Sequence, residues 1–465
     1  MRIGIDMFYA QSPSVFHGIG NYSFHHLSHL AEEPNVEMFF FQPIYSTLNR
    51  EAYIAELTRF IIDNQLDVFH FPSPMEAPYP DVIASEFLPP VYLTAMVFDL
   101  IPFIFPERYL PSEESRIHYE KLMALLRRMD LLLTISEYTR SDMIKFGFDP
   151  NKVFLSGFGR DEGYYVLDEA ELSDMAHLFP IEKPFILAFT PSDFRKNTNR
   201  LLGAFSTALD RTKADVHLLF LNVRNEVHLN QLIAEYGLTG RAHSGGRVTK
   251  PQLLRLYNKA LALAFPSLYE GIGLPVLEAM QCGLPVLSSN TSSLPEVVGN
   301  EAIVVDPYNE AAIAEGLVEL IQSDTLREDL RRRGLIRTQL FDWRDTAHRT
   351  VEALLQLHRS DSQKIIELPR EAAPSAIPEP VVPESEESVA VARKRRKKRR
   401  NKIKRIKKRR RLRLRRRKGA KGKSQFKARR MQRNKRGVKR TTPRSTKIKR
   451  RRKRKRKSHS KRRSG

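Results

Sequence analysis

Two glutamates, Glu270 and Glu278, stand at either end of a stretch that reads EGIGLPVLE. A glycine loop lets backbone N–H groups approach an anion such as a phosphate closely. A carboxylate beside a phosphate is unfavourable, but it accepts two or more O–H bonds from sugar hydroxyls. These residues fit a nucleotide-sugar, with phosphates on the N–H groups and hydroxyls on the acids. From these residues alone the alternative is a tight turn with two solvated glutamates, since short motifs often match by chance.

The elements around this stretch are predicted to be a strand, a loop, a helix and a second strand. The apolar run 261–265 is typical of a strand buried on both faces. Pro275 suits the start of a helix, because its missing N–H would be unpaired there, and Gly283 can end that helix in the left-handed conformation. A second apolar run begins at 284. The helix N-terminus therefore offers free N–H groups and the positive end of its dipole to an anion.

Two further loops have residues suited to phosphate. Arg195 and Lys196 are adjacent between a predicted strand at 185–189 and a predicted helix at 197–210. Arginine binds phosphate as a fork and lysine as a point charge. Gly18 and Gly20 follow the predicted first strand at 2–8 and allow close backbone approach to a phosphate or an acceptor. The alternatives are a solvated basic turn and an ordinary glycine turn.

The charge of the chain is concentrated at one end. The 465 residues have a formal charge of +26, yet residues 393–465 hold 45 Lys and Arg and no Asp or Glu. The other 392 residues hold 34 basic and 53 acidic residues, a formal charge of −19. The sequence thus predicts an acidic globular body and a separate polycation that is disordered when free, because like charges repel and few apolar residues offset that cost.

The single cysteine, Cys282, excludes an internal disulfide and fits a reducing compartment. We interpret it as a small packed side chain, because buried cysteines usually behave as small hydrophobes. The N-terminus lacks the apolar core of a signal peptide, and no run approaches the roughly 18 to 20 apolar residues of a membrane span. We expect a cytoplasmic protein, or one peripheral at the inner membrane surface.

Strand and helix patterns alternate along the body, which predicts a mainly parallel sheet covered on both faces in each of two domains. Ligands of such sheets bind beyond the carboxyl ends of the strands. The predicted strands are 2–8, 36–41, 67–71, 91–97, 131–135, 152–155, 185–189, 215–221, 241–248, 261–265 and 284–287. The predicted helices are 22–30, 52–62, 115–128, 197–210, 250–263, 275–281, 310–322, 326–337 and 343–358.

The segment EGIGLPVLEAMQCGLPV at 270–286 resembles the donor-site signature of retaining glycosyltransferases of family 4, which have the GT-B fold. The match continues through SSNTSSLPEV at 288–297 and VDP at 305–307. It implies an α/β fold of the GT-B type, with two doubly wound Rossmann-like domains facing across a cleft, and a metal-independent, retaining hexosyltransferase. The FDLIP segment at 98–102 resembles the family's HDLxP, with Phe98 in the usual histidine position, which removes an imidazole from the sugar site.

The resemblance also implies residue roles. Glu270 would contact the transferred sugar, Glu278 the ribose, and Lys196 the leaving diphosphate. Asp99 would lie at the sugar, although a turn or helix-cap aspartate is the alternative. The implied catalytic residues are Glu270, Lys196 and Asp99. The implied donor-binding residues are Arg195, Lys196, Gly271, Ile272, Gly273, Leu274, Glu278, Gly18 and Gly20. No cofactor is expected, because the nucleotide-sugar is a substrate. No metal is expected, because the loop N–H groups, Arg195 and Lys196 can stabilise the leaving diphosphate.

The composition of the chain and the resemblance together imply five parts. Residues 1–180 form an acceptor-side domain and 181–342 a donor-binding domain. Residues 343–360 form a terminal helix that crosses back to the first domain, where Trp343 anchors the packing. A Pro/Glu-rich linker at 361–392 precedes the disordered basic tail at 393–465.

The predicted function is transfer of a hexose, of the mannose or glucose type, from a nucleotide-sugar to a glycan, glycolipid or other envelope acceptor. The alternative is a polyanion- or nucleic-acid-binding protein that acts through its tail, with a structural or weakly active sugar-binding body. The tail is expected to bind a polyanion, namely an anionic membrane, a glycopolymer or nucleic acid, through counterion release.

Overall fold

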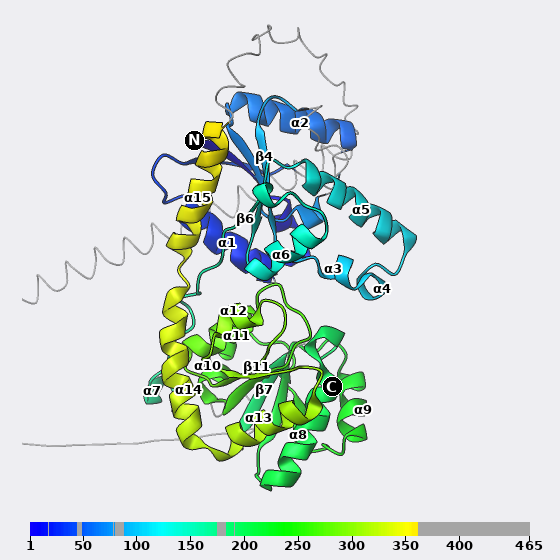
Figure 1. Cartoon of the computed structure of the whole chain (residues 1–465), viewed down its shortest axis with the longest axis vertical. Coiled ribbons are helices and arrows are strands. Elements are labelled where there is room, and N and C mark those ends of the chain that lie inside the picture. The colour runs from blue at the N-terminus through cyan, green and yellow to red at the C-terminus, as the bar shows by residue number, and fades with distance from the viewer. Residues whose placement is uncertain are drawn as a thin grey trace, which may run out of the picture. The chain divides into compact units, whose positions relative to one another are not determined.

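Two parallel sheets of six strands each organise the part of the chain that the computed structural model describes (Figure 1). The structure describes residues 1–16, 18–43, 49–77, 79, 88–173, 183–189 and 191–360. All of these belong to one unit, residues 1–369. The predictions of a linker at 361–392 and a disordered tail at 393–465 lie outside the described residues. The boundary predicted near residue 180 also stays a prediction.

The N-terminal half carries the first sheet, in the order β2-β1-β3-β4-β5-β6. Its strands are β1 Arg2–Asp6, β2 Glu37–Phe41, β3 Val68–Phe71, β4 Tyr92–Val97, β5 Leu131–Thr134 and β6 Val153–Leu155. The C-terminal half carries the second sheet, in the order β12-β11-β10-β7-β8-β9. Its strands are β7 Phe185–Phe189, β8 His217–Leu221, β9 Ala242–Ser244, β10 Ala262–Phe265, β11 Val286–Ser289 and β12 Ile303–Val305.

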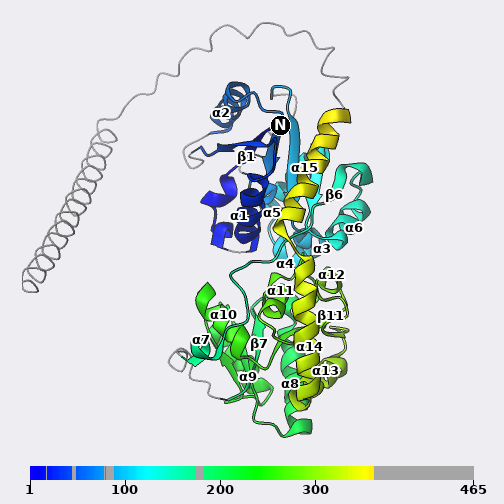
Figure 2. The same ribbon diagram turned by 90° about the vertical axis from the view of Figure 1, so that its left-hand side faces the viewer.

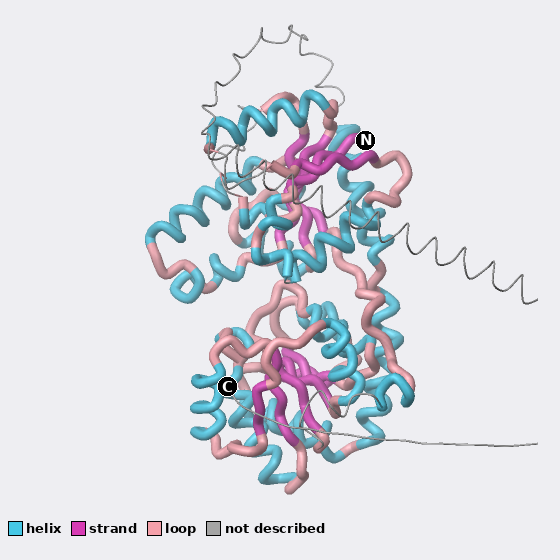
Figure 3. Tube along the Cα trace, turned by 180° about the vertical axis from the view of Figure 1, so that it is seen from behind, coloured by secondary structure: helices cyan, strands magenta, loops and turns pink. Residues whose placement is uncertain are grey.

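Helices cover both faces of each sheet (Figure 3). In the N-terminal half they are α1 Gly18–Leu30, α2 Arg50–Asp63, α3 Ile101–Ile104, α4 Pro106–Tyr109, α5 Glu113–Arg128 and α6 Glu137–Lys145. The helices that follow the first sheet in the chain are α7 Glu169–Ser173, α8 Thr198–Thr212, α9 Glu226–Glu235, α10 Lys250–Lys259, α11 Leu274–Gln281, α12 Leu294–Val298, α13 Glu310–Gln322, α14 Asp324–Arg337 and α15 Trp343–Ser360. The central strands β5, β7 and β10 are buried along their whole length, as expected for parallel sheets covered twice.

Each sheet has one point at which its strand order reverses. In the second sheet this point lies between β7 and β10, which pair in parallel. Loops that follow neighbouring strands at such a point diverge to opposite faces and leave a crevice for a ligand. The loops after β7 and β10 are the ones that carry Arg195, Lys196 and Glu270, so the fold places the predicted donor residues at the reversal.

The terminal helix α15 packs against α1 and β5 of the N-terminal half (Figure 2). Trp343 is buried, and its ring lies edge-on to Tyr22 with the centroids 4.9 Å apart. The side chain of Thr350 contacts His26 at 2.9 Å and Ser156 at 2.7 Å. These contacts hold α15, the segment predicted to cross back, against the N-terminal half.

Several predicted boundaries differ from the structure, and three of the differences follow from local contacts. The first strand ends at Asp6 instead of residue 8, because a 3-10 helix begins at Phe8. The helix predicted at 250–263 ends at Lys259: the backbone turns extended at Ala260 and joins the second sheet. The strand predicted from 284 begins at Val286, because the N–H of Leu284 still donates to the carbonyl of Ala279 at 2.9 Å.

Candidate active site

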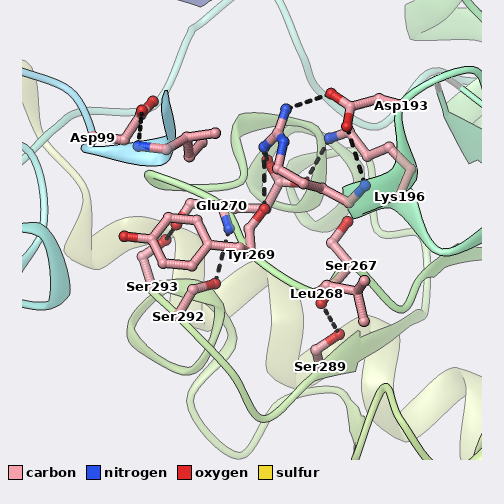
Figure 4. A network of polar contacts seen from close by, with 12 residues as sticks. Asp99, Asp193, Lys196, Ser267, Leu268, Tyr269, Glu270, Ser289, Ser292 and Ser293 are labelled. Carbon is pink, nitrogen blue, oxygen red and sulfur yellow. Dashed lines mark hydrogen bonds and ion pairs between the residues drawn. The ribbon is translucent and has the colours of Figure 1, made fainter. Parts of the chain in front are cut away.

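The loops after β7 and β10 bring one carboxylate and two cations together. Glu270 Oε1 accepts a hydrogen bond from Lys196 Nζ at 2.6 Å, and Glu270 Oε2 lies 3.4 Å from Arg195 Nη1. Glu270 is only 8% exposed, and Figure 4 shows Lys196 turned towards it. The ammonium of Lys196 also lies 4.5 Å from the centroid of the Phe265 ring. The sequence predicted all three residues at one site, and the structure places them in contact.

Serines of the SSNTSS segment fix the backbone of Glu270. The Ser292 hydroxyl accepts a hydrogen bond from the N–H of Glu270 at 3.0 Å, and the Ser293 hydroxyl donates to its carbonyl at 2.9 Å. Ser289, the last residue of β11, donates a hydrogen bond to the carbonyl of Ser267 in the loop after β10 at 2.6 Å. Both sides of the Glu270 peptide are therefore tied to the loop after β11, which limits how far its carboxylate can move.

Glycines flank the helix α11 on both sides, as predicted. Gly273 is the N-cap with φ of 95°, and Pro275 lies in the first turn. Gly283 follows the helix with φ of 68°. Cys282 is buried at the end of this helix, and burial raises the pKa of its thiol, so it remains protonated. This supports a packing role for Cys282.

Glu278 lies further along α11 and has a tyrosine partner. The hydroxyl of Tyr257, from α10, donates to Glu278 Oε2 at 2.9 Å. Burial raises the pKa of Glu278 to about 7, and the bond from Tyr257 offsets part of that effect. This partner could not be predicted from the sequence, because Tyr257 is a single aromatic residue on an amphipathic helix. Glu278 and Glu270 thus have different partners, and their separate roles stay a prediction.

The N-terminal half supplies the other side of the Glu270 loop. The Ser136 hydroxyl caps α6 by accepting from the N–H of Thr139 and donates to the carbonyl of Gly271 at 2.9 Å. A Cβ at Gly271 would lie 2.7 Å from the Phe98 carbonyl and 3.2 Å from Asp99 Cβ. Glycine is therefore required at 271, because the two loops touch there.

Asp99 and Phe98 are placed by local contacts. Asp99 Oδ1 accepts from the N–H of Ile101 at 2.9 Å, the turn bond that was the alternative to a sugar contact. Burial raises the pKa of Asp99, partly offset by that bond. The Phe98 ring packs edge-on to Tyr22, with centroids 5.1 Å apart. Phe98 therefore belongs to the core, whereas Asp99 borders the Gly271 loop.

The two glycines after the first strand differ in position. A Cβ at Gly18 would meet Leu274 at 3.7 Å, so Gly18 faces the start of α11. A Cβ at Gly20 would lie 2.2 Å from the Val15 carbonyl. Gly20 is buried and makes room for its own preceding turn. The donor-binding role of Gly20 therefore stays a prediction that rests on the resemblance. Ile272, another predicted donor-binding residue, is buried in the core.

Arg195 has partners that the sequence did not reveal. Its guanidinium donates three hydrogen bonds: Nη2 to Asp193 Oδ2 at 2.6 Å, Nε to the hydroxyl of Tyr109 at 2.6 Å, and Nη1 to the Tyr269 carbonyl at 3.1 Å. Burial would lower the pKa of Arg195, but Glu270 and Asp193 outweigh this and raise it. The guanidinium is a fixed cation beside Glu270.

The described residues contain neither a metal site nor a membrane-spanning helix. No group of three or more His, Cys, Asp or Glu side chains among them is arranged to hold a metal ion. None of their helices has the length and apolarity needed to cross a membrane.

Comparisons with known proteins identify the family of the chain. Residues 171–336 match the family model described as glycosyl transferases group 1. The chain is 31% identical over 259 residues to O-antigen chain mannosyltransferase B of Escherichia coli, covering 55% of this chain and 68% of that protein. It is 29% identical over 272 residues to the serotype-specific mannosyltransferase WbdA of Escherichia coli, but spans only 33% of its length.

The fold also matches a solved structure. Alr3699/HepE of Anabaena, crystallised with UDP-glucose, superposes with a TM-score of 0.58 and 17% identity, over 78% of this chain and all of that one. The two Rossmann-like halves have the GT-B fold, and the family match identifies a glycosyltransferase. The chain belongs to the group 1 glycosyl transferases. The narrower assignment to family 4 stays a prediction.

Proposed function

We propose that this protein is a retaining hexosyltransferase that moves mannose from a nucleotide-sugar to a glycan or glycolipid. The ion pair between Glu270 and Lys196 at the reversal of the second sheet carries this proposal. A cation suited to a diphosphate and a carboxylate suited to sugar hydroxyls lie 2.6 Å apart in this pair, which supports the proposal. The relatives named as mannosyltransferases favour mannose over glucose.

The chemistry follows from these groups. The bond between the anomeric carbon and the phosphate oxygen breaks, and its electron pair leaves with the nucleoside diphosphate. Lys196, the positive charge of Arg195 and the start of α11 stabilise that charge as it develops. The acceptor hydroxyl bonds to the anomeric carbon on the face that the phosphate leaves, and its proton passes to a phosphate oxygen. Glu270 is already paired with two cations, which makes it a poor covalent nucleophile and favours this front-face route.

A further part of the proposal is that Lys196 acts in place of a metal ion. Lys196→Ala should lower kcat by at least a hundredfold, the scale of losing one preorganised charge at the transition state. EDTA should leave the wild-type rate unchanged. Strict dependence on added Mn²⁺ or Mg²⁺ would contradict this assignment.

The function itself is tested by a donor panel. GDP-mannose, GDP-glucose, UDP-glucose and UDP-galactose are each offered to the full chain with oligomannose or lipid-linked glycan acceptors, and release of nucleoside diphosphate is measured. We expect turnover with GDP-mannose and loss of turnover in Glu270→Ala. Product analysis by NMR should show the anomeric configuration of the donor retained. Binding of a donor without turnover of any of them would instead indicate a non-catalytic sugar-binding body.

A further inference from the structure

Tyr109 brings a hydroxyl from the N-terminal half into the polar contacts of the C-terminal half. It is the last residue of α4, and its hydroxyl donates to Asp193 Oδ1 at 2.9 Å. The same oxygen accepts from Arg195 Nε at 2.6 Å. Asp193 and Arg195 close the ring through the 2.6 Å bond between Oδ2 and Nη2. Three side chains from two halves thus form one closed set of hydrogen bonds.

The Arg195 side chain links this set of hydrogen bonds to Glu270, the proposed catalytic carboxylate. Nη1 of Arg195, the nitrogen not used by Tyr109 or Asp193, faces the Tyr269 carbonyl at 3.1 Å and Glu270 Oε2 at 3.4 Å. A guanidinium is planar, so fixing Nε and Nη2 fixes the direction of Nη1 as well. The position of the Glu270 carboxylate is therefore linked to Tyr109 through one rigid group.

The ionisation of the partners supports this arrangement. Burial would raise the pKa of Asp193, but Arg195 outweighs burial and the net pKa is lowered, so Asp193 remains a carboxylate. Burial raises the pKa of Tyr109 to about 12, so its hydroxyl keeps the proton that it donates. Each partner therefore keeps the protonation state that its bonds need near neutral pH.

We propose that Tyr109 is a positioning residue for glycosyl transfer, which orients Arg195 together with Asp193 and so places Glu270 when the two halves are in contact. In an opened cleft the hydroxyl of Tyr109 would leave Arg195, whose direction towards Glu270 would then depend on Asp193 and the Tyr269 carbonyl alone. Contact between the halves is thereby coupled to assembly of the site. This inference rests on the proposed function, since it requires that Glu270 takes part in transfer.

Tyr109→Phe separates positioning from packing. The substitution keeps the ring, which contacts Phe194 with centroids 6.0 Å apart and lies 5.8 Å from the guanidinium carbon of Arg195. Only the hydroxyl is lost. We expect kcat to fall about tenfold, the scale of losing the one hydrogen bond that orients the Arg195 cation, while the Kd for GDP changes less than twofold. The thermal midpoint should fall by only a few degrees (about 2–4 °C), since the two lost hydrogen bonds are partly exposed and the ring packing is kept.

Tyr308→Phe is the matched control. Arg200 lies over the Tyr308 ring at 5.4 Å, a similar arginine–tyrosine contact on an exposed side chain. This variant should keep wild-type kcat and Kd. An unchanged kcat in Tyr109→Phe, or a fall in kcat that is matched by a proportionate weakening of GDP binding, would overturn the proposal.

A double-mutant cycle tests the route through Glu270. In a Glu270→Gln background the carboxylate is absent, so Tyr109→Phe should cost less than twofold in kcat. Independent, multiplicative effects of the two substitutions would refute coupling through Arg195. The proposed function fails separately: in that case the wild type transfers no hexose, or Glu270→Gln is as active as the wild type.

Discussion

The carboxylates of Glu270 and Glu278 have different neighbours, which predicts different effects of removing them. Glu270 faces Lys196 and Arg195, whereas Glu278 faces the hydroxyl of Tyr257. Glu270→Ala should mainly lower kcat, because the grip on the sugar is lost as the anomeric bond breaks. Glu278→Ala should mainly weaken nucleotide binding, by about 1.5–3 kcal/mol, the range for a hydrogen bond to a charged group.

Steady-state kinetics and calorimetric titration with GDP separate the two effects. Glu319→Ala serves as a control, because Glu319 is exposed on α13. Wild-type kcat in Glu270→Ala together with wild-type affinity in Glu278→Ala would show that the donor site lies elsewhere.

A pH dependence follows from the raised pKa of Glu278. Burial raises this pKa from 4.5 to about 7, so between these values the folded state holds a proton that the unfolded state has lost. The contribution of Glu278 to folding stability is therefore full below pH 4.5 and is lost as the pH rises through 7. The wild type should lose stability relative to Glu278→Gln over this window, and urea unfolding at pH 5 and pH 8 measures it. A difference that does not change with pH would contradict the raised pKa.

At the scale of elements, the loop and helix at 270–283 were predictable and the links between loops were not. The glycines, Pro275 and the flanking apolar runs act locally, so the chain order alone indicates a strand, a loop and a helix. Tyr109 and Arg195 are 86 residues apart, and their contact depends on how the two halves meet. The single tyrosines at 109 and 257 have no pattern that distinguishes them from ordinary packing residues, so their bonds to Arg195 and Glu278 appear only in three dimensions.

The N-terminus of α6 offers a prediction at this scale. Glu296, from α12, accepts hydrogen bonds from the N–H groups of Glu137 at 2.9 Å and Tyr138 at 2.8 Å. A carboxylate there satisfies two free donors and faces the positive end of the helix dipole. Glu296→Ala should lower the free energy of unfolding by about 1–2 kcal/mol, the range for loss of a cap.

Urea unfolding of Glu296→Ala, Glu296→Gln and Glu319→Ala measures this effect. The glutamine keeps one acceptor and should lie between the wild type and the alanine variant. If Glu296→Ala unfolds at the same urea concentration as Glu319→Ala, the cap contributes nothing.

At the scale of the whole molecule, the acidic body and the Lys/Arg-rich residues 393–465 are predicted to act separately. Removing residues 385–465 should leave turnover on a small soluble acceptor within about twofold of the full chain. It should abolish binding to heparin and to anionic vesicles, and binding by the full chain should weaken steeply with salt, as counterion release requires. A truncated protein that is folded but inactive on the small acceptor would show that these residues belong to the enzyme.

The return of α15 to the first half has a consequence for biosynthesis. The N-terminal half leaves the ribosome first, yet its helix α1 lacks the cover that Trp343 and Leu354 provide, and His26 and Ser156 lack the hydroxyl of Thr350. The second sheet, in contrast, is complete once β12 has emerged at Val305. The half that is translated first is therefore completed last, and a nascent chain must protect its unfinished surface for nearly two hundred residues of synthesis.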